Sequence, residues 1–446
     1  MPPKLALTLC SLFVLFLLKL NRKQYPEAST ALWIPTIWML LAASKPLGVW
    51  FNAGGASMEM GSPLDRNFLS ILAIIGIIIL AKRGFNWSEA VNSNFWAILL
   101  LGFMFISTFW TDIITVSLKR WARELIVFIM AFVVSTEIDA KKSLMCLFQR
   151  IIYILLPFSY VLINYFPYLG REYGRWSGEL MWIGMSSQKN GLATLCLFSI
   201  LFIIWGFISK SKEALPPVVW YEKYVEIFIF LLSLWLFGGP NHTATYSATS
   251  TVALSVGVLL MAGSFWLKRM NIMLGANLMS ILISTIIIFG IITPFAGGLF
   301  VSDLALTFNR DETLTGRSDI WAYLFPYAMN KPILGHGFGG FWTDAIREAT
   351  SSHAHNGYLD VILNLGFWGL IQFSIYLISS CFRSVKMMNY DFRWGCLWTS
   401  LLFSAVVHNI AESTLTSFSS MLSATLLFLF VSENRIGFIK KSNISL

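Results

Sequence analysis

The sequence predicts an all-α integral membrane protein with 12 to 13 transmembrane helices. Of its 446 residues, 56% are hydrophobic and only 12% are charged, about half the charged fraction of a typical soluble domain. Apolar runs recur along the whole chain, and about 20 apolar residues suffice to cross a bilayer as a helix. No linker rich in Pro, Gly or Ser divides the chain. We therefore expect one membrane domain with a large external loop that contains short helices.

Thirteen apolar segments are the candidate membrane helices. They comprise residues 5–20, 31–44, 67–81, 95–110, 122–136, 148–166, 191–208, 224–238, 249–267, 277–298, 357–380, 395–410 and 416–432. The first run is followed by Lys19, Arg22 and Lys23, whereas a cleaved signal peptide carries its charges in front. We interpret that run as a retained membrane helix.

The distribution of Lys and Arg predicts the orientation, because short cytoplasmic loops carry an excess of these residues. If the basic C-terminus is cytoplasmic, alternate short loops on the same side carry basic clusters. Residues 167–190 and 299–356 then lie outside. The predicted organisation is a membrane part (1–298), a large periplasmic loop (299–356) and a last part with three helices and the cytoplasmic C-terminus (357–446). The net charge of +9 is spread over short loops, which argues against nucleic-acid binding.

The cysteines indicate neither a disulfide framework nor a thiolate metal site. Each of the five lies in or beside an apolar run, and none forms a CxxC pair. We expect them to be small core residues. They are Cys10, Cys146, Cys196, Cys381 and Cys396.

The polar stretch 313–369, between two apolar tracts, is the candidate active site. Residues 315–319 predict a helix start, and Asp319 in its first turn suits the helix dipole. Arg317 is electrostatically misplaced there, which indicates a bound anion, with a solvated or headgroup-bound arginine as the alternative. The glycine cluster 335–340 lacks the strand–turn–helix context of a nucleotide motif. It favours a tight turn that approaches a ligand or a neighbouring helix.

His353, His355 and Asn356 precede the apolar run that starts near residue 357. A histidine at a helix N-terminus is disfavoured in its protonated form, so it can act as a general base towards a sugar hydroxyl. A metal pair completed by Asp344 or Glu348 is one alternative, although the spacing matches no zinc signature. An ordinary hydrogen-bonded histidine is the other.

The second external segment supplies further cations. Arg171, Arg175 and Lys189, the last followed by Asn190, could surround one diphosphate together with Arg317. Residues 112–124 add a basic cluster for which lipid headgroups are an equally good partner: Lys119, Arg120 and Arg123.

Several motifs together resemble one protein family. His355-Asn356, nine further residues and then Gly366-Phe367-Trp368-Gly369 match the H-N-x9-G-x-x-G pattern of the O-antigen ligase and polymerase superfamily. Residues 315–321 and 332–339 resemble the large external loop of that family. Residues 186–191 and 26–51 look most like its exopolysaccharide-polymerase branch.

The resemblance implies a fold similar to the C-type membrane glycosyltransferases. It also implies transfer of a glycan from a polyprenyl (undecaprenyl) diphosphate carrier, on the periplasmic face of the bacterial inner membrane, without nucleotide sugar, metal or cofactor. By motif position it makes His355 and Arg317 the catalytic residues. The expected substrate-binding residues are Lys189, Asn190, Arg171, Arg175, Asn356, His353 and Asp319.

One departure from the family bears on the choice between activities. Ligases carry a second arginine near the start of the helix that begins around residues 247–251, and this chain has none there. A polymerase is therefore favoured, with Lys189 as the replacement charge, over a ligase that acts on lipid A core or protein.

Two alternative hypotheses place the protein outside the enzymes. A transporter or flippase needs ionisable residues at mid-membrane, but the apolar runs are nearly free of them apart from edge positions such as His408 and Asp360. The second alternative hypothesis is a non-catalytic subunit of an assembly complex. The expected partners are lipid-linked oligosaccharide, membrane lipids, and the chain-length regulator and flippase of the same pathway.

Overall fold

The computed structural model describes residues 1–52, 62–174, 178–210, 220–240, 247–296 and 316–444. The long helices are α1 (Pro3–Gln24), α4 (Pro63–Lys82), α7 (Ile114–Ser135), α8 (Ala140–Tyr165), α10 (Lys189–Lys210), α11 (Trp220–Gly238), α12 (Ala248–Arg269), α13 (Ala276–Phe295), α17 (Gly357–Tyr390), α18 (Phe392–His408) and α19 (Met421–Ile444). The shorter elements are α2 (Trp33–Ala43), α3 (Leu47–Trp50), α5 (Trp87–Ser93), α6 (Phe95–Ser107), α9 (Pro167–Gly170), α15 (Arg317–Asn330), α16 (Asp344–Ala349) and the antiparallel strands β1 (Arg171–Tyr173) and β2 (Leu180–Trp182).

Each predicted apolar segment coincides over most of its length with a helix of the described residues, which confirms the all-α membrane class. A backbone surrounded by lipid must satisfy its hydrogen bonds internally, and a helix does so. Seven helices in the described ranges are long and apolar enough to span a bilayer, or eight if α5 and α6, bent by 97°, form one span. The remaining predicted spans are shorter or carry more charge: α2 and α19 have short apolar stretches, and α7 contains several charged residues.

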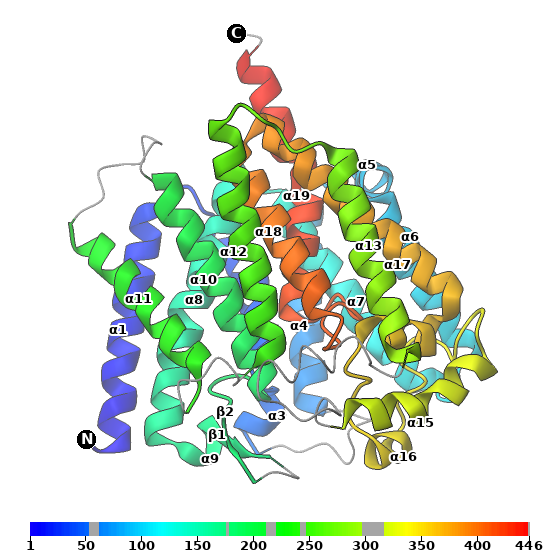
Figure 1. Ribbon diagram of the computed structural model, residues 1–446. Coiled ribbons are helices and arrows are strands. Elements are labelled where there is room, and N and C mark those ends of the chain that lie inside the picture. Colours follow the sequence, from blue (N-terminus) through cyan, green and yellow to red (C-terminus); the bar gives the residue numbers. More distant parts are fainter. Residues whose placement is uncertain (53–61, 175–177, 211–219, 241–246, 297–315, 445–446) are drawn as a thin grey trace.

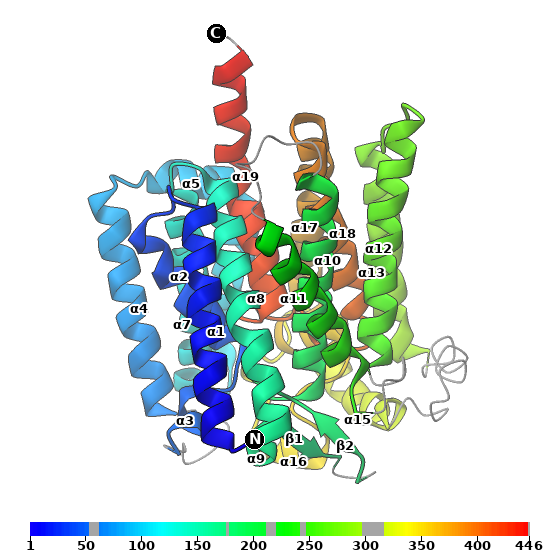
Figure 2. The same cartoon turned by 90° about the vertical axis from the view of Figure 1, so that its left-hand side faces the viewer.

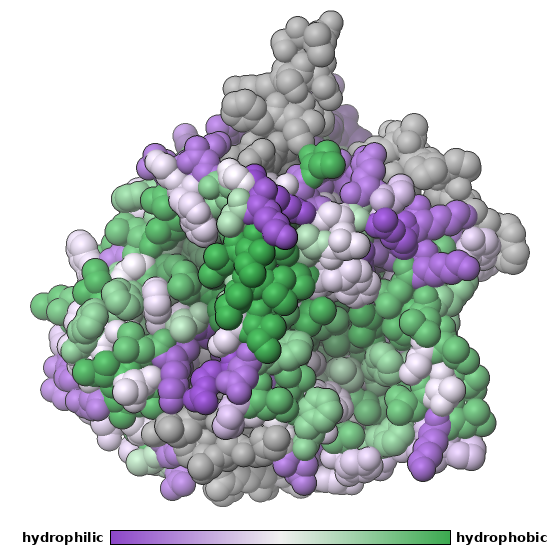
Figure 3. Space-filling model, turned by 180° about the vertical axis from the view of Figure 1, so that it is seen from behind, coloured by the Kyte–Doolittle hydropathy of each residue, from purple (hydrophilic) through white to green (hydrophobic). Residues whose placement is uncertain are grey.

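The long helices form a bundle whose two ends differ (Figures 1 and 2). The short elements α3, α9, β1, β2, α15 and α16 gather at one end, together with the N-terminus, and the C-terminus lies at the other. On the face drawn in Figure 3, hydrophobic residues dominate the middle of the molecule, and hydrophilic residues gather towards its two ends. Apart from α3, these short elements belong to the two segments that the sequence predicts to be external, and on that prediction we call their end the external end. Residues 297–315 of the large loop lie outside the described residues.

The glycine cluster lets the 331–340 segment dock against α17. Gly366 interrupts α17 with a φ of 65°, and the backbone N–H of Phe367 donates to the Pro332 carbonyl at 2.7 Å. At Gly335, which also has a positive φ, a Cβ would lie 2.5 Å from the Gly366 nitrogen. Only glycine permits this approach. The predicted close contact with a neighbouring helix is confirmed.

All five cysteines are free and buried, as predicted. They lie among the apolar side chains of the bundle, and the sequence-based expectation that they are core residues is confirmed.

Candidate functional site

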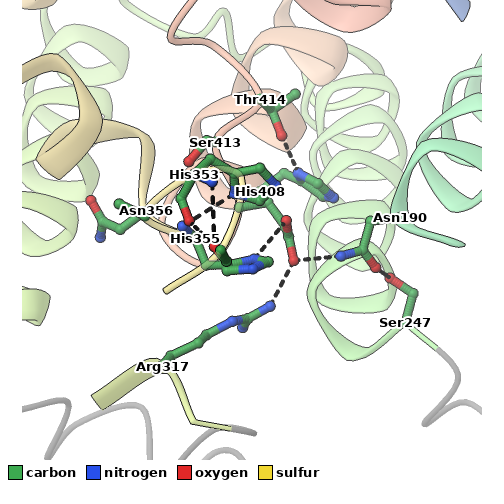
Figure 4. Close-up of polar contacts among 12 residues, drawn as sticks. Asn190, Ser247, Arg317, His353, His355, Asn356, His408, Ser413 and Thr414 are labelled. Atoms are coloured by element: carbon green, nitrogen blue, oxygen red, sulfur yellow. Dashed lines mark hydrogen bonds and ion pairs between the residues drawn. The ribbon is translucent and has the colours of Figure 1, made fainter. Parts of the chain in front are cut away.

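The site is built around Glu412, a carboxylate in the short segment between α18 and α19. Arg317 donates from Nη2 to its Oε1 at 2.6 Å, and the Asn190 amide donates to the same oxygen at 2.5 Å. The other oxygen lies 3.3 Å from Nδ1 of His355. Figure 4 shows Arg317, His355 and Asn190 converging from separate elements. Two residues predicted to be catalytic, 38 positions apart in the sequence, thus share one carboxylate.

The charges around Glu412 keep it ionised. Burial alone would raise the pKa of Glu412, but the neighbouring His355 and Arg317 outweigh burial and hold the pKa well below its ordinary value. The anion that the sequence predicted near Arg317 is therefore, in this structure, a side chain of the same protein. The alternative of a solvated arginine is wrong, because the Arg317 side chain is only 14% exposed and is paired.

The carboxylate also fixes the tautomer of His355. An ionised carboxylate only accepts hydrogen bonds, so Nδ1 of His355 must carry a proton. In the neutral ring, Nε2 then has the free lone pair. This arrangement gives the imidazole a defined basic nitrogen, with Glu412 placed to stabilise the charge that appears when that nitrogen takes up a proton.

Asn356 holds His355 in place and does not face a ligand. Its side-chain oxygen accepts from the Leu359 N–H and so caps α17, while its amide donates to the carbonyls of Gly290 at 3.0 Å and Ile410 at 2.9 Å. The residue is completely buried. The prediction that Asn356 binds substrate is therefore corrected: these bonds use its polar atoms to fix the turn in which His355 adopts a φ of 50°.

Asp360, in the first turn of α17, stabilises the loop that carries His355. Its carboxylate accepts from the backbone N–H of Ala354, from the indole of Trp342 at 2.9 Å and from the hydroxyl of Ser413. These three groups belong to three separate segments of the chain, and Ser413 directly follows Glu412 in the sequence. Asp360 therefore ties the histidine turn to the carboxylate segment.

The ring of His353 packs edge-on against the ring of His355, with ring centroids 4.2 Å apart. Its Nδ1 accepts from the backbone N–H of His355, and burial, with a contribution from His355, lowers the pKa of His353 to about 4. His353, His355 and Glu412 offer ligand atoms within 4.8 Å of one another, so these residues could hold a metal ion. The third group is Glu412 and not the expected Asp344 or Glu348. Arg317 occupies the same carboxylate with a positive charge, which opposes a metal cation.

The other predicted residues are only partly brought together. Lys189 begins α10 beside Asn190. Arg171 donates instead to the Ile163 carbonyl at 2.7 Å, near the end of α8, which is not a contact with the Glu412 cluster. Asp319 is exposed, two residues after Arg317, and side chains at that spacing do not share a helix face. Arg175 lies outside the described residues. From the basic cluster at 112–124, Arg120 donates to the backbone carbonyls of Gly339 and Trp342.

The segment that lacks the ligase arginine contributes hydroxyl groups. The hydroxyl of Ser247, which precedes α12, lies 3.4 Å from the Asn190 side-chain oxygen and 3.0 Å from the Ser250 hydroxyl, within hydrogen-bond distance of both. Ser250 in turn lies 3.0 Å from Nε2 of His408. A polar chain of α12 and α18 thus supports Asn190, which presents its amide to Glu412.

Lys45, a residue that the sequence did not single out, fastens the segment in front of α10. The buried amine donates to the carbonyls of Gly184 at 2.5 Å and Ser186 at 2.6 Å, and the Lys45 backbone N–H donates to Met185 at 2.9 Å. Burial lowers the pKa of Lys45 to about 8, so the amine is still charged at neutral pH. This clamp holds the segment that leads into α10, from which Asn190 reaches Glu412.

Fold and site together define a multi-pass membrane protein whose external end gathers an arginine, an imidazole and an amide on one buried carboxylate. Residues 236–374 match the family described as O-Antigen ligase. The chain is also 23% identical, over 309 residues, to the exopolysaccharide production protein ExoQ of Rhizobium meliloti (strain 1021). That alignment covers 66% of this chain and 66% of the relative. The resemblance to the O-antigen ligase and polymerase superfamily is confirmed.

Proposed function

We propose that the protein is a membrane glycosyltransferase that polymerises polysaccharide repeat units. It transfers a glycan from a polyprenyl diphosphate carrier to an acceptor sugar hydroxyl on the periplasmic face of the bacterial inner membrane. The observation that carries this proposal is the shared contact of His355 and Arg317 with Glu412. A base and a cation held together at the external end of a membrane bundle meet the two needs of the reaction.

The chemistry follows from the three side chains. Nε2 of His355 takes the proton of the acceptor hydroxyl, and the acceptor oxygen forms a bond to the anomeric carbon of the donor sugar. The bond between that carbon and the diphosphate oxygen breaks, and the polyprenyl diphosphate leaves with the electron pair. Glu412 stabilises the resulting imidazolium.

Arg317 and Lys189 are the proposed partners of the leaving diphosphate. The Arg317 guanidinium has five N–H donors, so the bond to Glu412 leaves others for phosphate oxygens. Stabilisation of the charge that develops on a leaving group is often the largest contribution to catalysis. None of these steps calls on a metal ion, so we propose a metal-independent enzyme.

Two observations favour polymerisation over ligation. The segment before α12 supplies Ser247 where ligases carry an arginine, and the matched relative is named for exopolysaccharide production. A ligase that transfers the glycan to lipid A core or protein is the second candidate, favoured by the description of the matched family. The chain-length regulator and flippase of the pathway are the proposed protein partners.

Reconstitution with a purified lipid-diphosphate oligosaccharide tests the function. We expect chain growth with wild-type protein, none with His355→Ala, and growth with the matched control His336→Ala. His336 lies in the same external part and contacts the Tyr327 carbonyl at 3.1 Å, outside the Glu412 cluster. Transfer only to a lipid A core acceptor would make the protein a ligase. Normal chain growth by His355→Ala would exclude the general-base role.

A further inference from the structure

A second polar site lies at the opposite end of the bundle. A cavity of about 590 Å³ opens between the start of α13, the last turns of α17 and α19. Lys386, which lines it, follows the His355 turn by roughly eight turns of α17. The cavity therefore belongs to the end at which the C-terminus lies (Figure 1), and it is separate from the Glu412 cluster.

Arg383 forms a fixed cationic wall of this cavity. Its guanidinium lies over the Phe430 ring at 3.9 Å and donates to the carbonyls of Phe430 and Ser93. Nη1 is also 3.6 Å from a carboxylate oxygen of Glu433. These contacts from α5 and α19 hold the guanidinium in one position, with its side chain 19% exposed.

Lys386 adds a second cation on the same face of α17. It follows Arg383 by three residues, a spacing that puts two side chains side by side on a helix, and it is exposed. Glu433 and Asn389 also line the cavity. The cavity thus presents two positive charges, one negative charge and an amide at a single membrane boundary.

The walls continue into a surface suited to acyl chains. Phe382, beside Arg383, is 43% exposed, and on α13 Leu278 and Ile281 are 53% and 63% exposed. Leu278 lies in the first turn of α13, next to the part of that helix that lines the cavity, and Ile281 lies one turn further along it. A molecule with a charged head in the cavity can therefore lay hydrocarbon along α13.

We propose that this cavity binds the headgroup of a phospholipid that carries both a phosphate and a primary ammonium group, the chemistry of phosphatidylethanolamine. The phosphate contacts Lys386 and Arg383, and the ammonium group donates to Glu433 and to the Asn389 side-chain oxygen. A purely anionic headgroup leaves Glu433 facing negative charge. A trimethylated ammonium group has no N–H to donate to it. Basic pockets between membrane helices are recurrent lipid sites.

Thermal unfolding of the purified full-length protein, measured with added lipid, tests the proposal. Ligands that bind only the folded state raise the unfolding temperature. We expect phosphatidylethanolamine to raise the unfolding temperature more than phosphatidylcholine or phosphatidylglycerol with the same acyl chains. Soluble phosphoethanolamine should not reproduce the shift. Equal shifts by all three lipids, or the full shift with phosphoethanolamine, would overturn the proposal.

Two variants and a control assign the charges. Glu433→Gln should remove the preference for phosphatidylethanolamine over phosphatidylcholine, and Lys386→Met should weaken the response to both lipids by roughly tenfold in lipid concentration. Lys82→Met, an exposed lysine in the last turn of α4, should behave as wild type. A retained lipid preference in Glu433→Gln contradicts the site. The readout involves no glycosyl transfer, so it stands apart from the proposed function.

Discussion

Replacing Glu412 by glutamine tests the organisation of the site most directly. The substitution preserves size, but one of the two terminal atoms becomes an N–H donor. The amide cannot accept from Arg317 and Asn190 on one side and from His355 on the other, as the carboxylate does. Nδ1 of His355 then no longer has to carry the proton, and Nε2 is no longer held as the base.

The size of the effect follows from the role of the base. Proton transfer by a positioned side chain contributes about 10²- to 10⁴-fold in rate, which corresponds to about 2.7 to 5.4 kcal/mol at 1.36 kcal/mol per tenfold. We expect kcat of Glu412→Gln to fall by roughly this factor, and KM for the lipid-linked donor to change much less. The variant also leaves the Arg317 guanidinium without its anion. Because that side chain is 14% exposed, the loss of stability should stay below the about 3 to 5 kcal/mol seen for fully buried pairs.

The assay is the rate of chain growth in lipid nanodiscs, together with the unfolding temperature of each variant. If Glu412 acts through His355, Glu412→Gln should add little to the loss already caused by His355→Ala, because residues that act as a unit are not additive. Multiplicative losses in the double variant would refute that link. A Glu412→Gln protein that retained kcat within about threefold of wild type would refute the role of the carboxylate altogether.

Four further outcomes are expected. Arg317→Lys should slow glycan transfer, because an ammonium group replaces a planar guanidinium that can donate two parallel hydrogen bonds to a phosphate. Full activity would exclude diphosphate binding by Arg317. Lys45→Met should raise KM for the lipid-linked donor and Lys45→Arg should partly restore it, measured by steady-state kinetics; an unchanged KM in Lys45→Met would contradict the clamp. Since the pKa of Glu412 is lowered in the folded state, its contribution to stability is present above the ordinary value of 4.5 and is lost as the pH falls below it. Unfolding temperatures of wild type should therefore drop more steeply below pH 4.5 than those of Glu412→Gln. Treatment with a chelator should leave chain growth unchanged, whereas added Zn²⁺ should inhibit by competing with Arg317 for Glu412; loss of activity on chelation would favour the metal alternative.

The helices were predictable because lipid imposes one solution on the backbone, but their ends were not. The run 148–166 belongs to α8, which starts at residue 140, where the Asp139 side chain caps the helix. The run 357–380 belongs to α17, which continues to Tyr390. These extensions are amphipathic or charged, so a search for apolar runs stops before them. The 97° bend between α5 and α6 depends on packing and leaves no pattern in hydropathy.

His355 and Arg317 were predictable because they lie in motifs, whereas Glu412 does not. A single acid in a short polar segment resembles any loop residue, and its role comes from the three donors that the fold brings to it. Asn356 could have been assigned correctly, since an asparagine directly before an apolar run is a recognised helix cap. The position of Asn356 in the sequence is compatible with substrate binding and with helix capping. Its burial and its hydrogen bonds in the structure favour the capping role.

The two segments that resemble the exopolysaccharide-polymerase branch contact each other in the structure and lead to the Glu412 cluster. Lys45, in the first, binds the carbonyl of Ser186, in the second, and the second leads into the Asn190 that reaches Glu412. Residues 236–374, which match the O-antigen ligase family, supply Arg317 and His355, but Glu412 and Asn190 lie outside that match. The part of the site that lies within the matched residues is therefore the imidazole of His355 and the guanidinium of Arg317. The part that holds them together comes from segments whose resemblance is to the polymerase branch, or that carry no motif at all.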